Sequence, residues 1–226
     1  MPALIAPTEL APHLDDPDWA IIDCRFDLAR PDWGAQAFAA GHIPHALYAH
    51  LEHDLSGPRT PRSGRHPLPQ VEVLAATFAR FGIDERVQVV AYDQGTGAFA
   101  ARLWWLLRWL GHPQVAVLNG GLASWELARL PLSSSIETRA PRQFRAKTEA
   151  HRVASGSEVA ALVSSGALAR AEQLLIDARS ADRFAGENET IDPVAGHSGA
   201  RLYAGSWSEW ITYPDRPVAR GPETER

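Results

Sequence analysis

The residues best placed to do chemistry follow an apolar run at 87–92. Asp93 comes directly after this run, Gly95 and Gly97 lie in the short loop behind it, and a helix is expected over 98–110. A loop between a strand and a helix N-terminus presents oriented backbone N–H groups, which stabilise an anion. The two glycines also suggest a nucleotide-phosphate site, but an isolated Gly-x-Gly is weak evidence for one. We expect the Asp93 carboxylate itself to cap the loop or the helix that follows.

Only one residue of the chain could act as a thiol nucleophile. Cys24 follows a second apolar run at 19–23 and precedes Arg25. The simplest interpretation is a buried, inert cysteine, with Arg25 paired to a nearby carboxylate; the alternative is a persulfide site that Arg25 assists. A single cysteine excludes a disulfide framework and a cysteine-based metal cluster, and it fits a reducing cytoplasm. The nine histidines show no His-x-x-x-His spacing, so no metal site and no cofactor are predicted.

The composition excludes several classes of function. The chain has 226 residues, of which 45% are hydrophobic and 22% charged, so it has room for one large domain or two small ones. A net charge of -5 provides no basic surface for nucleic acid. The most apolar stretch, 98–110, contains Arg102 and Arg108 and is too short to span a bilayer, and the N-terminus lacks a basic signal-peptide region. We therefore expect a cytoplasmic protein with no nucleic-acid or membrane partner.

Strand-like and helical segments alternate along the first 130 residues. Strands are expected at 19–23, 47–49, 87–92 and 115–118, and helices near 8–14, 34–40, 70–81, 98–110 and 122–128. This alternation predicts an α/β fold whose parallel sheet is flanked by helices. Residues 131–152 lose the periodicity and are typical of an interdomain linker. A helix at 155–163, a strand at 174–177 and a short helix at 180–185 then begin a further unit.

Short sequences of the first half recur in the second half, as in a tandem repeat. The matches are Ile22-Asp23-Cys24-Arg25 with Ile176-Asp177-Ala178-Arg179, Gly41-His42 with Gly196-His197, and Asn119-Gly120-Gly121 with Ala204-Gly205-Ser206. The spacing then fails, because His42 and Gly120 are 78 positions apart whereas His197 and Gly205 are 8 apart, which leaves the second copy 70 residues shorter. In the first copy those residues include the central strand, its glycine loop and the helix that follows.

These motifs resemble the tandem rhodanese family, the thiosulfate and 3-mercaptopyruvate sulfurtransferases. The resemblance rests on the repeated Asp-x-Arg, on Gly41-His42-Ile43-Pro44, on Asn119-Gly120-Gly121-Leu122 with Trp125, and on the segment 203–210. It implies a complete, non-catalytic rhodanese-like domain at 1–130, a linker at 131–152 and an incomplete second copy at 153–226 that packs on the first domain.

The resemblance also implies a reaction that moves sulfane sulfur from thiosulfate or 3-mercaptopyruvate to a thiophilic acceptor through a cysteine persulfide. The nucleophilic cysteine would follow the second domain's central strand, within the segment that is missing between His197 and Gly205. Asp93 occupies the equivalent position in the first domain. The chain therefore resembles a truncated sulfurtransferase that is inactive; the alternative is a non-catalytic binding module on the rhodanese scaffold.

Three residues are candidates for binding a small anionic sulfur donor. Arg183 matches an arginine that holds the anionic substrate in related catalytic domains, although a solvated helix residue is an equal interpretation. Asp54 and His66 fall near positions where such enzymes present an aspartate and a histidine to the active-site loop across the domain interface. A polar surface loop explains these two residues equally well.

Overall fold

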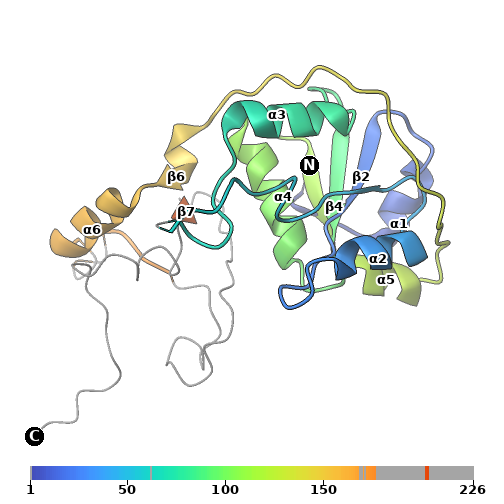
Figure 1. Ribbon diagram of the computed structural model, residues 1–226, viewed down its shortest axis with the longest axis horizontal. Helices are drawn as coiled ribbons and strands as arrows, with labels where there is room; N and C mark the ends of the chain where they lie inside the picture. The colour runs from blue at the N-terminus through green and yellow to red at the C-terminus, as the bar shows by residue number, and fades with distance from the viewer. Residues whose placement is uncertain (1, 62, 168–169, 171, 177–201, 204–226) are drawn as a thin grey trace, which may run out of the picture. The chain divides into compact units, whose positions relative to one another are not determined.

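The computed structural model describes residues 2–61, 63–167, 170, 172–176 and 202–203 (Figure 1). The chain divides into two compact units. The first unit comprises Met1–Gly57 and Leu68–Ala150, and the second comprises Pro58–Pro67 and His151–Arg226. Among the described residues, no helix is both long and apolar enough to cross a membrane.

The first unit is built on a five-stranded parallel sheet. Its strands are β1 (Leu4–Ile5), β2 (Trp19–Asp23), β3 (Leu47–Tyr48), β4 (Gln88–Tyr92) and β5 (Val115–Leu118), in the order β1-β5-β4-β2-β3. The central strand β4 pairs with β2 on one side and with β5 on the other. All five residues of β4 are buried, as a parallel strand covered on both faces requires. The predicted α/β fold with a parallel sheet is therefore confirmed.

Helices cover both faces of this sheet (Figure 1). The helices α3 (Val71–Arg80) and α4 (Ala98–Trp109) lie over one face; α1 (Pro7–Leu10), α2 (Trp33–Ala40) and α5 (Gly121–Leu127) lie over the other, and the 3-10 helix η1 (Ala11–His13) extends α1. Successive strand side chains point to opposite faces, so Ile22 and Val89 join the α3–α4 core whereas Ile21 and Val90 join the other core. Two separate hydrophobic cores thus hold the three layers together.

Residues 131–149, which the sequence assigns to a linker, run along the first unit without forming a helix or a named strand; we call this segment the strap. At its start, Ser133 and His42 exchange backbone hydrogen bonds of 2.8 Å. Near its end, the Lys147 N–H donates to the Leu110 carbonyl at 2.9 Å. The change from the first unit to the second comes between Ala150 and His151.

Two arginines fix the middle of the strap to the turn before β2. Arg139 donates to the carbonyl oxygens of Trp19 and Pro17 at 2.7 and 2.6 Å. Arg142 donates to the Asp18 carboxylate at 2.8 Å and also to the Pro17 carbonyl at 2.8 Å. Guanidinium groups suit this role because one planar fork donates several hydrogen bonds at once.

His45 contacts both Glu137 of the strap and Asp15, which follows η1, and these contacts depend on pH. Its Nδ1 lies 2.6 Å from Glu137 Oε2 in the strap, and its Nε2 lies 3.1 Å from Asp15 Oδ1. The hydrogen bond to Glu137, together with the charges of both carboxylates, raises the pKa of His45 above its ordinary value despite the opposing effect of burial. A pKa that is higher in the folded state gives stability that is fully present below the unfolded-state pKa and is lost as the pH rises through the folded-state pKa.

We therefore expect His45→Gln to lower the free energy of unfolding most at about pH 5.5, below the unfolded-state pKa, and progressively less as the pH rises through the raised pKa of the folded state. Urea unfolding of wild type and variant at matched pH values measures this difference. A difference that stays constant across the pH range would contradict the contact's ionic character.

The 3-10 helix η2 (Ala150–Arg152) spans the change between the units, and the described elements of the second unit are β6 (Val153–Ala154), α6 (Gly156–Ser164) and β7 (Leu202–Tyr203). β6 and β7 pair in parallel. Ser155 caps α6: its Oγ accepts the Glu158 N–H at 3.2 Å, and the Glu158 carboxylate accepts the Ser155 N–H at 2.7 Å.

Part of the sequence-based assignment for this unit is wrong. Residues 174–176, expected to begin a strand at 174–177, form no strand and expose all three side chains. An isolated segment is not a strand, because a strand exists only where a neighbour shares its backbone hydrogen bonds. The helix expected at 180–185 lies outside the described residues.

Candidate functional site

The loop between β4 and α4 encloses the carboxylate of Asp93. Oδ1 accepts the N–H groups of Gly95 and Gly97, both at 2.9 Å. Oδ2 accepts the N–H groups of Phe99 at 3.0 Å and Ala100 at 3.3 Å. The Asp93 side chain is completely buried. Four backbone donors thus surround one anionic group at the N-terminus of a helix, an arrangement we call the N–H cradle.

Glycines give the N–H cradle its shape. Gly97 has φ +78°, in the left-handed region that favours glycine, and it directly precedes α4. Gly121, at the start of α5, approaches from the neighbouring turn so closely that a Cβ there would lie 2.5 Å from the Asp93 carbonyl oxygen. The Asp93 carboxylate caps both the loop and the helix, as the sequence predicts.

The cradle in the first unit is chemically occupied by the chain itself. A ring of backbone donors can stabilise a thiolate, a persulfide or a bound anion. Here the Asp93 carboxylate uses those donors, and it can neither carry a transferable sulfur atom nor tolerate a second anion in the same place. The geometry is that of an anion site filled by an internal ligand.

A buried ion pair lies beside this loop, at the carboxyl end of β2. Asp23 is completely buried and Arg25 is 5% exposed. Arg25 Nη2 lies 2.7 Å from Asp23 Oδ2 and also donates to the Gly41 carbonyl at 2.7 Å. The Tyr92 hydroxyl donates to the same Asp23 oxygen at 2.7 Å. The expected pairing of Arg25 with a nearby carboxylate is confirmed. The hydrogen bonds of this ion pair are made to other groups of the first unit.

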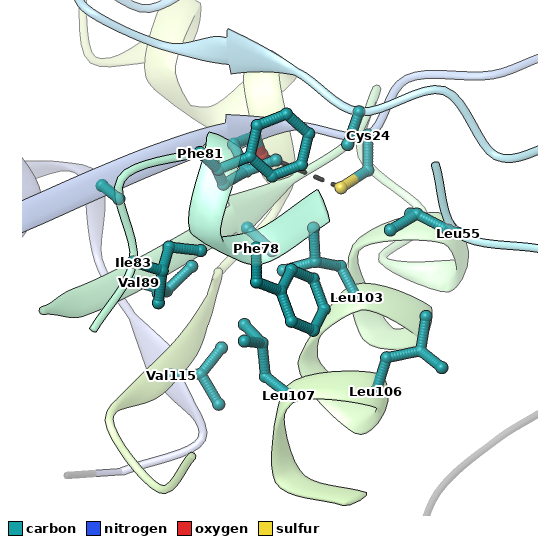
Figure 2. Packing of buried hydrophobic residues seen from close by; sticks show 14 of the residues in the cluster. Cys24, Leu55, Phe78, Phe81, Ile83, Val89, Leu103, Leu106, Leu107 and Val115 are labelled. Atoms are coloured by element: carbon teal, nitrogen blue, oxygen red, sulfur yellow. Dashed lines mark hydrogen bonds between the residues drawn. The ribbon is translucent and has the colours of Figure 1, made fainter. Parts of the chain in front are cut away.

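Cys24, the one thiol of the chain, points into the core beneath α3 and α4 (Figure 2). It is 1% exposed, and Leu55, Phe78 and Leu103 belong to the same cluster of buried side chains. Burial raises the pKa of the Cys24 thiol well above its ordinary value, and the negative charges of nearby aspartates add to the effect. A thiol that stays protonated and shielded is a poor nucleophile, so the interpretation of a buried cysteine is confirmed.

The predicted substrate-binding residues are divided between the two units. Asp54 belongs to the first unit, where its carboxylate accepts the His50 N–H at 2.8 Å and pairs with Arg80 of α3. His66 belongs to the second unit and is half-buried. Arg183 lies outside the described residues, as does most of the junction between His197 and Gly205. Roles for Asp54, His66 and Arg183 in binding a sulfur donor remain predictions.

Arg102 is a structural anchor that the sequence analysis did not assign. Its Nε donates to the Leu55 carbonyl at 2.9 Å, and its Nη2 donates to Ser56 Oγ at 3.2 Å. Burial lowers the pKa of Arg102 to about 10. The sequence did hold a signal for this role, an arginine within an otherwise apolar helix, because a buried guanidinium group needs oxygen atoms that accept its hydrogen bonds. Among the described residues, no group of three or more histidine, cysteine, aspartate or glutamate side chains could hold a metal ion.

Comparison with known proteins gives consistent matches. Residues 6–128 match the family model of the rhodanese-like domain. The chain is 38% identical to a probable 3-mercaptopyruvate sulfurtransferase of Pseudomonas aeruginosa, over 96% of this chain and 98% of that protein. It is 35% identical to the 3-mercaptopyruvate sulfurtransferase of Escherichia coli K12, over 89% of this chain and 70% of that protein. The crystal structure of the sulfotransferase SseA from Escherichia coli superposes with a TM-score of 0.71 at 30% identity, covering 96% of this chain and 80% of that one.

Proposed function

The chain belongs to the rhodanese-like family, and from this premise we propose that it is a sulfurtransferase of the thiosulfate and 3-mercaptopyruvate type that has lost the family's reaction. The reaction requires a cysteine that can hold a persulfide in a cradle of backbone donors. A small anionic sulfur donor, thiosulfate or 3-mercaptopyruvate, would be the ligand if any site for it remains.

One observation carries the proposal of inactivity. The thiol and the N–H cradle, which the reaction needs together, are separated in this chain. Cys24 lies in the hydrophobic core with its pKa raised by burial. The N–H cradle of the first unit instead holds the carboxylate of Asp93. The sequence contains no further cysteine that could occupy a second cradle.

The structure of the second unit supports its interpretation as an incomplete copy of the first. Tyr203 of β7 lies opposite Ala154 of β6, in the register in which Leu118 of β5 lies opposite Ile5 of β1. The helices that follow β1 and β6 also begin alike. A glutamate three positions after each N-cap accepts the N–H of the cap residue, Ala6 at 2.8 Å and Ser155 at 2.7 Å.

The alignment with the Pseudomonas aeruginosa relative supports the same interpretation. It extends over 283 positions although this chain has 226 residues, so at least 57 positions (283 − 226) stand opposite gaps in this chain. We therefore propose a complete first domain, a linker that includes the strap, and a second domain that lacks its central strand and catalytic loop.

Two assays test the loss of activity: thiosulfate with cyanide, and 3-mercaptopyruvate with a thiol acceptor. We expect wild type and Cys24→Ser to give the same rate as a reaction without protein, while the full-length Pseudomonas aeruginosa relative serves as the positive control. Circular dichroism checks that Cys24→Ser is folded, because the substitution buries a hydroxyl group. Turnover by the wild type would refute the proposal, and its loss in Cys24→Ser would identify Cys24 as the nucleophile.

The second candidate function is a non-catalytic binding module. The completeness of the first unit favours it, since five strands and both cores are present without the second unit. Calorimetric titration with thiosulfate separates the two functions. Binding without turnover that Arg183→Ala weakens would favour the module, and absence of binding would favour the simple loss of function.

A further inference from the structure

Both ring nitrogens of the His42 side chain face carbonyl oxygens. Nδ1 lies 2.7 Å from the Phe38 oxygen, in the last turn of α2, and Nε2 lies 3.2 Å from the Ser135 oxygen in the strap. His42 is completely buried. A carbonyl oxygen only accepts hydrogen bonds, and a neutral imidazole donates from one nitrogen alone. The imidazolium therefore satisfies both oxygens, whereas the neutral ring turns a lone pair toward one of them.

The elements that contact the His42 ring suit a positive charge. The Phe38 oxygen is one of the last carbonyls of α2, which lack partners within the helix and carry its partial negative charge. The Phe38 ring stacks on the imidazole with the centroids 3.9 Å apart, and the face of an aromatic ring attracts a cation. Neither α2 nor residues 131–136 of the strap contain a charged side chain.

The charged groups that approach the same turn from other elements balance one another. Arg25 donates to a carbonyl of this turn, and Asp23 lies 2.7 Å away from it as its counter-ion. Glu126 of α5 adds a further negative charge that acts on Arg25. The Tyr92 hydroxyl accepts a backbone N–H of the turn and stays neutral, because burial raises its pKa well above the ordinary value. No isolated cation therefore opposes protonation from β2, α5 or β4.

His45, three positions after His42, holds the next part of the strap. Its Nδ1 lies 2.6 Å from Glu137 Oε2, and its Nε2 lies 3.1 Å from Asp15 Oδ1. Only the protonated ring donates to both carboxylates. Together with the backbone and side-chain contacts of His42, this ion pair fixes the strap at three alternate positions, 133, 135 and 137.

We propose that residues 133–137, the start of the strap, form a pH-dependent latch, which protonation of His42 and His45 closes and which opens more often as the pH rises. The distances set this direction. A neutral His42 ring keeps its proton on Nδ1, toward the nearer oxygen at 2.7 Å, and its Nε2 lone pair then faces the Ser135 oxygen. The bond that is lost is therefore the one to the strap.

The latch ends where the charges of the strap no longer change. Loss of the positive charge of His45 weakens its contacts with the strap in the same direction as the loss from His42. The next anchors, Arg139 and Arg142, are guanidinium groups that remain charged at any pH near neutrality. The opening is thus confined to the first part of the strap, and it does not depend on the proposed loss of sulfurtransferase activity.

Amide hydrogen exchange of the full chain, followed by NMR, measures the opening. The Ser133 N–H, which donates to the His42 oxygen at 2.8 Å, reports on the latch. The Arg142 N–H, which donates to the Ala79 oxygen at 3.0 Å, reports on the later part of the strap. After correction for the intrinsic exchange rate, the protection of Ser133 should fall at least about tenfold from about pH 5.5 to about pH 8.5, and that of Arg142 should not change.

The nitrogen chemical shifts of the histidine rings identify the groups responsible. Both ring nitrogens of His42 should carry protons at the lower pH, and only Nδ1 at the higher pH. His45→Gln should reduce the change in Ser133 protection, because it removes one of the two titrating contacts. Glu85→Gln alters an exposed carboxylate in the turn before β4 and serves as the control, which should leave that change as it is in wild type.

Three results would overturn the proposal. The first is protection of Ser133 that does not depend on pH, and the second is an equal fall for Ser133 and Arg142, which would mean that the whole strap or the whole unit opens. The third is a His42 ring that is neutral at both pH values or that keeps its proton on Nε2 when neutral, because its bond to the strap would then survive.

Discussion

Asp93→Ala is expected to lower the free energy of unfolding of the first unit by about 3 kcal/mol, because the N–H groups of Gly95, Gly97, Phe99 and Ala100 lose their acceptor together. Water can replace the carboxylate at Gly95, which is exposed, but the Ala100 N–H is buried. The cap of α4 and a negative charge at the helix N-terminus are lost as well. Urea unfolding followed by tryptophan fluorescence measures the change.

Asp27→Ala provides the matched control for this prediction. Asp27 also accepts a backbone N–H, that of Ala29 at 2.9 Å, and pairs with Arg30, but it lies at the surface with a side chain 27% exposed. Its removal should cost no more than about 1 kcal/mol, as for other exposed pairs. Equal losses for Asp93→Ala and Asp27→Ala would show that the N–H cradle does not need its internal anion.

Asp23→Ala is expected to destabilise the first unit by about 3–5 kcal/mol, because it leaves the Arg25 guanidinium buried without its counter-ion. The Tyr92 hydroxyl loses its acceptor in the same variant. Arg25→Leu should cost a similar amount by leaving the Asp23 carboxylate uncompensated. Urea unfolding of both variants and of the double variant Asp23→Ala/Arg25→Leu measures the coupling.

The double variant should lose clearly less than the summed losses of the two single variants, because it removes both buried charges at once. Arg86→Ala serves as the control, since Arg86 pairs with Asp84 at 3.4 Å and its side chain is 72% exposed. That change should cost at most about 1 kcal/mol. Additive losses for Asp23 and Arg25 would mean that the two side chains do not stabilise each other.

These two expectations concern how the first unit is stabilised by groups of its own chain. An N–H cradle at a helix N-terminus requires an anion for stability, and in the first unit Asp93 supplies it permanently. A domain stabilised in this way keeps its shape without a bound sulfur atom.

The amino-acid sequence determined the local architecture of the first unit. β2 and β5 were predicted at 19–23 and 115–118, the bounds that the structure has, and α4 was predicted to within one residue. The role of Asp93 followed from its position between a strand and a helix. These features are readable because apolar periodicity, glycine and capping residues act over a few neighbouring positions.

Only the tertiary structure decided the features that depend on residues far apart in the chain. β1 has two residues and is a strand because β5, more than a hundred positions later, accepts it at the sheet edge. The strap has no periodicity, and its course follows from Arg139 and Arg142 reaching oxygen atoms near Trp19. Residues 174–176 have the composition of a strand but form none, and Cys24 is buried because two helices cover it. In each case a local sequence fixes what a segment can form, and its distant neighbours decide whether it forms.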